Sequence, residues 1–261
     1  MTEAVRRRAR GARWLAPALC LALVASGLGG CGPARQPDDT STADAGFPRA
    51  DRPVSPAGAT QFSTEAQRDN QDEAQEVMDL AGVRPGMTVA DVGAGEGYYT
   101  VRLAARVGRK GRVLAQDIDD GALHRLGARV ERERMTNVSV QRGAPGDPRL
   151  PARSFDRVLM VHMYHEVSEP YAFLWHLWPA LRKGGQVAVV DRDLPTDRHG
   201  IPPTLLFCEF EAAGFRLIAF HRKPEISGYH AQFEAAGNRP EPGEMRSCRI
   251  ESGKVARTKG R

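Results

Sequence analysis

The sequence has little cysteine, no apolar run long enough to cross a membrane, and little excess charge beyond its first residues. Only four cysteines occur among 261 residues. None forms a Cys-x-x-Cys pair or a Cys/His spacing of the kind that binds structural zinc. The apolar stretch Trp14 to Leu28 is too short and too rich in small residues for a membrane-spanning helix. With 41% hydrophobic and 26% charged residues, the chain can still bury a globular core.

The formal net charge of +5 is concentrated at the N-terminus. Without five of the 37 basic residues and one of the 32 acidic residues, all before residue 31, 32 basic and 31 acidic residues remain. The remaining basic excess lies in residues 236–261, which we expect to form a disordered tail. Nothing in this distribution indicates a nucleic-acid partner.

Residues 1–31 combine an arginine-rich leader, the apolar stretch and a terminal Leu28-Gly29-Gly30-Cys31. This arrangement resembles the signal and lipobox of bacterial lipoproteins. The resemblance implies cleavage before Cys31, a lipid on Cys31, and a location in the cell envelope facing the periplasm. An ordinary signal peptide or an uncleaved anchor with a chance cysteine is the alternative; a signal that is not processed would leave the chain at the cytoplasmic face.

Residues 32–61 are rich in Pro, Ala, Asp and Thr and have no apolar period, so we expect a flexible linker there. Of the two cysteines outside the leader, Cys208 falls in an expected helix and Cys248 in the expected tail. We therefore expect no disulfide between them, although an exported chain would permit one.

Strand and helix patterns alternate through residues 62–235, after a helix that begins near residue 64. The expected strands are 88–92, 112–117, 137–141, 155–163 and 186–190; the expected helices are 98–107, 119–134, 171–181 and 204–213; residues 215–221 and 229–233 form a final hairpin. This order predicts an α/β domain with a doubly wound, mostly parallel seven-stranded sheet and a C-terminal antiparallel hairpin. Such sheets bind ligands at the carboxyl ends of their strands, beside the first strand.

Three glycines, Gly93, Gly95 and Gly97, follow the first expected strand and precede a helix. Glycine at such a turn permits unusual backbone angles and lets a ligand approach the main chain. The dinucleotide fingerprint G-x-G-x-x-G requires a third glycine where the chain has Tyr98. A nicotinamide-dependent oxidoreductase therefore fails at the most diagnostic position.

The stretch Asp91-Val92-Gly93-Ala94-Gly95-Glu96-Gly97 instead resembles motif I of class I S-adenosylmethionine-dependent methyltransferases. Asp117 follows at the end of the second expected strand. Leu150-Pro151 with Ser154-Phe155-Asp156 is similar to the family's approach to its fourth strand. Leu181-Arg182-Lys183-Gly184-Gly185 is similar to its L-K-P-G-G turn, with Arg-Lys replacing Lys-Pro. The resemblance covers residues 62–235 and implies the Rossmann-like methyltransferase fold.

Carried over by position, the resemblance implies S-adenosylmethionine as cofactor. The glycine turn, with Gly93, Ala94, Gly95 and Gly97, would border its methionine portion, and Asp91 would orient its amino group. Asp117 would accept hydrogen bonds from the ribose hydroxyls, and Ile118 would pack against the adenine. Backbone groups of Gly143-Ala144 would reach the adenine edge, although Pro145 and Gly146 make this loop depart from the family pattern.

Methyl transfer from a sulfonium is an in-line displacement, so an enzyme mainly aligns the reacting atoms, and a base is needed only if the acceptor must lose a proton. Among the residues just past the fourth strand, His165 is the first candidate for general base or substrate hydrogen bonding, and Tyr164 and Glu166 come next. These residues could equally cap the strand or orient its loop. His162 alternates with apolar residues and is expected to be a packed core histidine.

Metal-ligating residue types also occur here: His162, His165, Glu166, Asp191, Asp193 and His199. His-x-x-His-Glu after a strand matches no recognised metal signature, and two separate loops would have to converge. We therefore expect no metal, and a metal-assisted catechol-type transferase remains an alternative hypothesis. Walls of an acceptor pocket are expected from Phe62 to Leu80, Trp175, Trp178 and Pro195 to Phe207.

The sequence thus favours transfer of a methyl group from S-adenosylmethionine to a small-molecule acceptor that it does not identify. The alternative is a lipoprotein that binds S-adenosylmethionine or S-adenosylhomocysteine without catalysis, as a sensor or scaffold. That alternative is motivated by a conflict, because the cofactor is made in the cytoplasm whereas a lipobox directs the domain outward. No pattern in the sequence indicates an oligomeric state.

Overall fold

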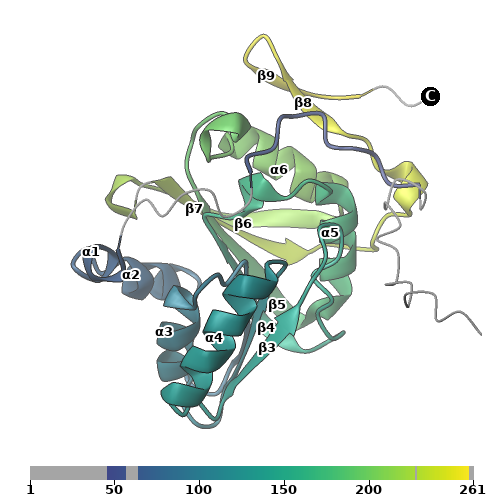
Figure 1. Cartoon of the computed structure of the whole chain (residues 1–261). Coiled ribbons are helices and arrows are strands. Elements are labelled where there is room, and N and C mark those ends of the chain that lie inside the picture. The colour runs from purple at the N-terminus through teal and green to yellow at the C-terminus, as the bar shows by residue number, and fades with distance from the viewer. Residues whose placement is uncertain (1–45, 57–63, 227, 259–261) are drawn as a thin grey trace, which may run out of the picture. The chain divides into compact units, whose positions relative to one another are not determined.

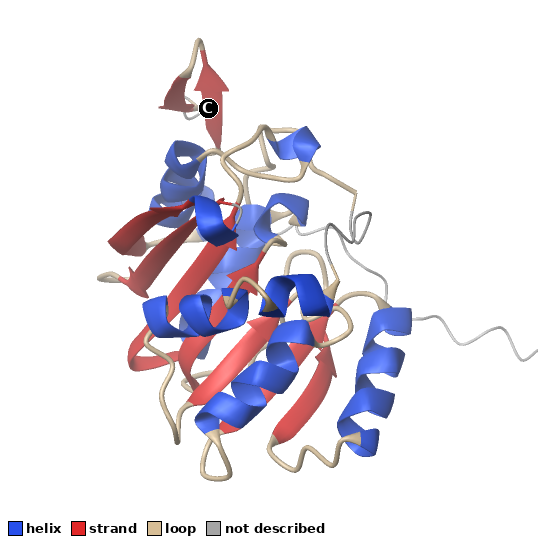
Figure 2. Ribbon diagram, turned by 90° about the vertical axis from the view of Figure 1, so that its left-hand side faces the viewer, coloured by secondary structure: helices blue, strands red, loops and turns tan. Residues whose placement is uncertain are grey.

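The structure, a computed structural model, describes residues 46–56, 64–226 and 228–258. One seven-stranded sheet, in the order β3-β2-β1-β4-β5-β7-β6, carries helices on both faces (Figures 1 and 2). The strands are β1 (Thr88–Val92), β2 (Arg112–Asp117), β3 (Val138–Arg142), β4 (Phe155–Val161), β5 (Leu181–Asp191), β6 (Phe215–Lys223) and β7 (Gly228–Ala235). The first five are parallel, and β7 pairs antiparallel with both β5 and β6. This confirms the expected doubly wound sheet and its final antiparallel pair.

Two layers of helices cover the sheet because side chains alternate between its faces. The helices are α1 (Glu65–Asp69), α2 (Glu73–Leu80), α3 (Tyr98–Val107), α4 (Asp120–Arg132), α5 (Pro170–Leu177) and α6 (Pro203–Ala212). On β4, Val158 and Met160 join the core under α5 and α6, whereas Leu159 between them joins the core under α2 and α3. All three side chains are fully buried, so the nearly continuous apolar run marks a central strand.

The strand order reverses at β1, which pairs with β2 on one side and β4 on the other. In an open parallel sheet this switch point leaves a crevice beyond the carboxyl ends of the two strands. The glycine turn follows β1, and the segment Met163 to Glu166 follows β4, so both candidate segments lie at this edge.

The expected N-terminal helix is divided into α1 and α2. The first piece ends at Asp69, and Asp72, the N-cap of α2, adopts a left-handed φ of 52° that separates the two pieces. The start of α1 has the capping box anticipated near residue 64, since the Thr64 hydroxyl accepts from the Gln67 amide and the Gln67 side chain accepts from the Thr64 amide.

The expected disordered tail contains ordered structure. Strands β8 (Cys248–Glu251) and β9 (Lys254–Arg257) form an antiparallel hairpin beside α6. Cys208 on α6 and Cys248 on β8 are joined by a disulfide with their Cα atoms 6.1 Å apart, so the expectation of no disulfide was wrong. The backbone amide of Cys248 also donates to the Tyr171 hydroxyl at 2.6 Å, which attaches the tail to α5.

Part of the expected linker is also ordered. Residues 46–56 run across the molecule, with Phe47 packed against the ring of Trp175 and Ser55 buried. The Arg52 guanidinium lies 2.8 Å from the carboxylate of Glu209 on α6, and both side chains are almost completely buried. We call residues 46–56 the N-terminal strap.

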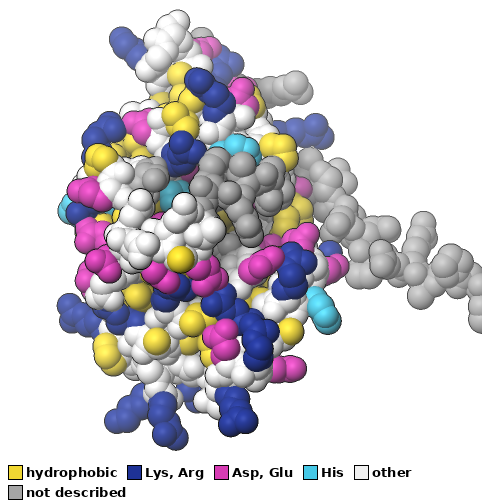
Figure 3. Space-filling model, turned by 60° about the vertical axis from the view of Figure 1, so that its left-hand side comes forward, with side chains coloured by type: hydrophobic (Ala, Val, Ile, Leu, Met, Phe, Trp, Pro, Cys, Tyr) yellow, Lys and Arg dark blue, Asp and Glu magenta, His cyan; other side chains and the backbone are white. Residues whose placement is uncertain are grey.

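The proposed signal, with Cys31, and residues 32–45 lie outside the described residues, as do residues 57–63. Among the residues that the structure describes, no helix combines the length and apolar character needed to cross a membrane. On the face drawn in Figure 3, acidic and basic side chains are interspersed, with basic side chains gathered at its lower end.

Candidate active site

The three glycines of the turn serve different purposes. All have positive φ angles, 71° at Gly93, 53° at Gly95 and 90° at Gly97. A Cβ on Gly93 would lie 2.7 Å from Cγ of Met163, and one on Gly97 would lie 2.5 Å from Cδ1 of the buried Leu126. A Cβ on Gly95 would meet no atom within 4 Å. Gly93 and Gly97 are therefore required by the protein's own packing, whereas Gly95 leaves the main chain open to a ligand.

Asp117, at the end of β2, is hydrogen-bonded to the glycine turn. One carboxylate oxygen accepts from the Gly95 amide at 2.8 Å, and the other accepts from the amides of Ile118 at 2.7 Å and Asp119 at 3.0 Å. A carboxylate has about four acceptor positions, so one remains for a ligand hydroxyl. Ile118 beside it is among the exposed large apolar side chains. The arrangement brings together an acceptor, an apolar surface and an accessible backbone.

Asp91 is a buried carboxylate on β1. The hydroxyl of Thr100 donates to it at 2.6 Å, and no ion pair joins it to a basic side chain in the part of the chain that the structure describes. Burial raises its pKa to about 6, the Thr100 hydrogen bond opposes this rise, and the charge of Asp117 adds to it. A cationic group placed beside Asp91 would supply the missing counter-charge.

The loop after β3 is closed on itself. The Ala144 amide donates to the carbonyl of Asp147 at 2.7 Å, so the donor that the resemblance directed at adenine is used within the loop. The Gly143 amide donates to the carbonyl of Asp117 at 2.9 Å. A Cβ on Gly143 would overlap the side-chain amide of Gln116, 1.8 Å away, so this glycine allows the loop to lie against β2.

Tyr164 points into the core. It begins a short 3-10 helix, Tyr164–Glu166, and its hydroxyl donates to the carboxylate of Glu209 at 2.9 Å. Arg52 of the N-terminal strap binds the same carboxylate. Burial raises the pKa of Tyr164 well above 10, so the phenol stays protonated. These contacts give Tyr164 a structural role, and they direct it towards α6 and the strap.

His165 is held by a carboxylate that sequence reasoning did not assign to it. Its Nδ1 lies 2.9 and 3.0 Å from the two carboxylate oxygens of Asp191, at the end of the neighbouring strand β5. Both side chains are buried, and the Arg192 amide donates to the same carboxylate at 2.8 Å. A proton on Nδ1, donated to Asp191, leaves Nε2 with a lone pair. The Asp-Arg-Asp at the end of β5 was the available signal for this partner.

The remaining polar candidates lie in three places. Glu166 and His199 lie near Nε2 of His165, with Oε1 of Glu166 3.9 Å away and the His199 ring centroid 5.7 Å from that of His165. Asp193 pairs instead with Arg222 at 2.9 Å. His162 has a left-handed φ of 54° and lies 4.0 Å from the carboxylate of Glu73 on α2, and burial lowers its pKa.

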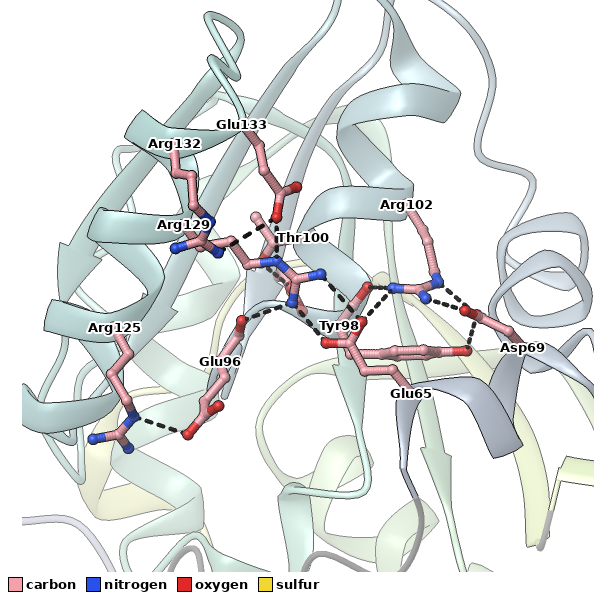
Figure 4. Close-up of polar contacts among 11 residues, drawn as sticks. Glu65, Asp69, Glu96, Tyr98, Thr100, Arg102, Arg125, Arg129, Arg132 and Glu133 are labelled. Atoms are coloured by element: carbon pink, nitrogen blue, oxygen red, sulfur yellow. Dashed lines mark hydrogen bonds and ion pairs between the residues drawn. The ribbon is translucent and has the colours of Figure 1, made fainter.

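Helix α1 is tied to the glycine turn by ion pairs that no sequence pattern had indicated (Figure 4). Glu65 contacts Arg129 on α4 at 2.6 Å and Arg102 on α3 at 3.4 Å, and Asp69 also pairs with Arg102. Arg129 in turn donates to the carbonyl of Glu96, within the glycine turn, at 3.1 Å. Of the expected wall residues, Trp175 donates to the carbonyl of Pro240 in the tail, and Trp178 donates to the carbonyl of Gly214, between α6 and β6.

Comparison with known proteins agrees with this geometry. Residues 89–185 match a family described as a methyltransferase domain. A curated relative, the ubiquinone/menaquinone biosynthesis C-methyltransferase UbiE of Salmonella arizonae, is 30% identical over 125 residues, which cover 45% of this chain and 47% of the relative. The chain thus spans about half the length of the curated relatives it matches.

Solved structures show the same fold. An S-adenosylmethionine-dependent methyltransferase from Aquifex aeolicus has a TM-score of 0.56 and 24% identity, over 66% of this chain and 97% of that one. The [4+2]-cyclase SpnF has a TM-score of 0.56 and 16% identity, over 75% of this chain and 91% of that one. The fold is the Rossmann-like fold of these solved methyltransferases, and residues 89–185 match a methyltransferase domain. Because a cyclase shares the fold, the reaction must be argued from the site.

Proposed function

We propose that this protein binds S-adenosylmethionine and transfers its methyl group to a small-molecule acceptor. The observation that carries the proposal is the hydrogen-bonded unit of Asp117 and Gly95 at the switch point of the sheet, with open space over Gly95. Glycine turns that close this way, beside an acidic residue at the end of the next strand, suit a nucleoside whose ribose hydroxyls need an acceptor.

The residues present fit the cofactor at each end. Asp91 supplies a buried carboxylate for the cationic amino group, and Asp117 keeps an acceptor position for the ribose. Ile118 offers an exposed apolar surface to the adenine. When bound, S-adenosylmethionine supplies an activated methyl group on a sulfonium sulfur. The task left to the protein is to align that methyl group with the acceptor atom and to exclude water.

His165 is the residue we assign to the acceptor side. It follows β4, the strand beside β1, and Asp191 fixes its ring through Nδ1. Its Nε2 can then accept a proton from an acceptor hydroxyl or hold it by a hydrogen bond. Tyr164 takes no part in this step, because its hydroxyl is bound to Glu209 in the core.

Calorimetry on the full-length chain tests the proposal. We expect micromolar binding of S-adenosylmethionine and S-adenosylhomocysteine and no binding of NAD. Asp117→Ala should weaken binding at least tenfold, whereas Asp120→Asn, a change to an exposed carboxylate on α4, should not alter it. Failure to bind both S-adenosylmethionine and S-adenosylhomocysteine would overturn the proposal, whether or not NAD binds. Transfer of labelled methyl groups to an acceptor library then separates an enzyme from a protein that only binds.

We also propose that the chain is exported and anchored by a lipid on Cys31. The leader and lipobox pattern motivates this, and the Cys208–Cys248 disulfide supports it, because structural disulfides form and persist in oxidising compartments. Mass measurement of the protein isolated from membranes is the test. A chain that begins at Cys31 with acyl groups is expected, and a chain that retains Met1 to Gly30 would contradict it.

A further inference from the structure

We propose that His165, Glu166 and His199 bind a divalent transition-metal ion of the zinc type. One ligand atom from each of the three side chains lies within 4.8 Å of the other two. Two imidazoles and one carboxylate form a donor set that proteins use for zinc and for non-haem iron, in sites that keep a position open for another ligand. Binding of the ion does not rest on the proposed methyl transfer.

The distances fit a metal centre after small side-chain movements. A zinc ion about 2.0–2.1 Å from each ligand atom would hold those atoms roughly 3.0–3.5 Å apart. His165 Nε2 and Glu166 Oε1 are already 3.9 Å apart. The rings of His165 and His199 are almost perpendicular, with an interplanar angle of 88°. The three ligand atoms, which lie within 4.8 Å of one another, would have to approach by up to roughly 1–2 Å to hold the ion.

A second observation separates this group from a chance cluster. Metal-binding histidines usually donate their other ring nitrogen to a carboxylate or carbonyl, which fixes the ring and raises its basicity. His165 has this partner, because the Asp191 carboxylate lies against Nδ1 at 2.9 Å and is itself completely buried. Nε2, which faces Glu166 and His199, is then the nitrogen with the free lone pair.

The backbone also holds His199 in place. His199 lies in the loop after β5, with a left-handed φ of 53°. Its amide donates to the hydroxyl of Ser55 at 3.1 Å, and that hydroxyl donates to the carbonyl of Thr196 at 2.5 Å. A non-glycine residue keeps such a φ when the surrounding structure fixes it, and such positions cluster at functional sites. The N-terminal strap therefore positions a ligand that is far from it in the sequence.

The position of the group suggests what the ion would do. Glu166 and His165 follow β4 directly, next to Met163, which packs against Gly93 of the glycine turn. An ion there would lie on the acceptor side of the site, where it could bind an acceptor oxygen and lower the pKa of its hydroxyl. A metal on Nε2 would take the place of the base role assigned to His165. The effect of the ion on the acceptor hydroxyl, unlike binding of the ion itself, rests on the proposed function.

The test uses the tag-free, full-length chain, stripped with a chelator and titrated with Zn²⁺ against a chromophoric competitor. We expect one equivalent per chain at submicromolar affinity. Changes to the ligands, His199→Asn and Glu166→Gln, should each lower affinity at least tenfold. Asp191→Asn, which changes the partner of His165, should lower it 10- to 100-fold. The control His124→Asn, on the exposed side of α4, should have no effect.

Co²⁺ provides a second readout, because its visible absorption reports coordination directly. Wild type and His124→Asn should develop the band, and His199→Asn should not. His199→Asn should unfold at the same temperature as the metal-free wild type, which shows that the missing band does not come from a loss of folding. All variants keep Cys20 and Cys31, so binding by these cysteines cancels in the comparison. Equal affinity in wild type and His199→Asn, or less than one-tenth of an equivalent bound, overturns the proposal. Since no cofactor is present, this result is independent of the calorimetry above.

Discussion

Asp91→Asn is the substitution for which the structure predicts opposite effects on stability and on function. Raising the pKa of the Asp91 carboxyl from 3.8 to about 6 corresponds to about 3 kcal/mol, because each pK unit is worth about 1.4 kcal/mol. The group is buried, so water screens little of this cost. Asparagine keeps the hydrogen bond from Thr100 and removes the charge. The variant should therefore be more stable than wild type at pH 7, by up to about 3 kcal/mol.

The pH dependence gives the sign of the effect. Because the folded-state pKa is raised, the folded state holds the Asp91 proton more tightly than the unfolded state does. Wild type then loses stability as the pH rises from about 4 to about 6, and the variant lacks this loss. Urea unfolding of both proteins between pH 4 and 8 should give a difference that starts near zero and reaches its plateau above pH 6.

Cofactor binding should act in the opposite direction. A cationic amino group beside Asp91 compensates the buried charge, so S-adenosylmethionine should stabilise wild type more than Asp91→Asn and bind the variant at least tenfold more weakly. A stability difference that does not vary with pH would refute the account of Asp91 as an uncompensated buried charge. Equal affinity of both proteins for the cofactor would refute its role in binding.

Three further predictions follow from other parts of the structure. Replacing Cys208 and Cys248 by alanine should cost roughly 4 kcal/mol in urea unfolding, because the disulfide closes a loop of 40 residues; a loss under 1 kcal/mol would show that the tail adds little to stability. Tyr164→Phe should cost about 1–3 kcal/mol, because a buried carboxylate loses a donor, and should leave kcat unchanged; a lower kcat at unchanged stability would return the hydroxyl to the reaction. Gly97→Ala should destabilise by about 2–4 kcal/mol because it overpacks the core at a positive φ, whereas Gly95→Ala should cost about 1 kcal/mol and mainly weaken cofactor binding; the reverse order in calorimetry and unfolding would contradict our account of the turn.

Local patterns in the sequence were sufficient to predict the sheet. The strands β1 and β2 and the helix α3 begin and end at the residues expected, because short β-branched runs and an amphipathic period are bounded by glycine and polar turns. The prediction was less accurate where tertiary contacts extend an element. Strand β5 begins at Leu181 rather than 186, because Leu181 already pairs with Phe155 of β4 and an irregular segment with a register shift, which contains the Lys-Gly-Gly residues, connects this pair to the regular pairing from Gln186.

Long-range pairs could not be read from the sequence. Arg52 and Glu209 are 157 residues apart, and their ion pair is what fixes the N-terminal strap, which composition alone classed as linker. The same holds for the disulfide and for His165 with Asp191, which are 26 residues apart, one in the 3-10 helix after β4 and the other at the end of β5. In each case one partner lies in a segment without a periodic pattern, and only the fold shows that the two side chains meet.

The proposed cofactor and the disulfide indicate different cellular compartments for the protein. S-adenosylmethionine is made in the cytoplasm, whereas a structural disulfide favours an oxidising exterior. The disulfide and the glycine turn lie in different parts of the structure. Cys208 and Cys248 join the tail to α6, on the face of the sheet opposite α3, and among the described residues neither cysteine belongs to the core cluster that contains α3. The state of the two cysteines therefore reports the compartment in which the chain folded. Thiol labelling in intact cells, read by mass, should find both cysteines blocked if the chain is exported; two labelled thiols would place it in the cytoplasm and contradict the lipoprotein proposal.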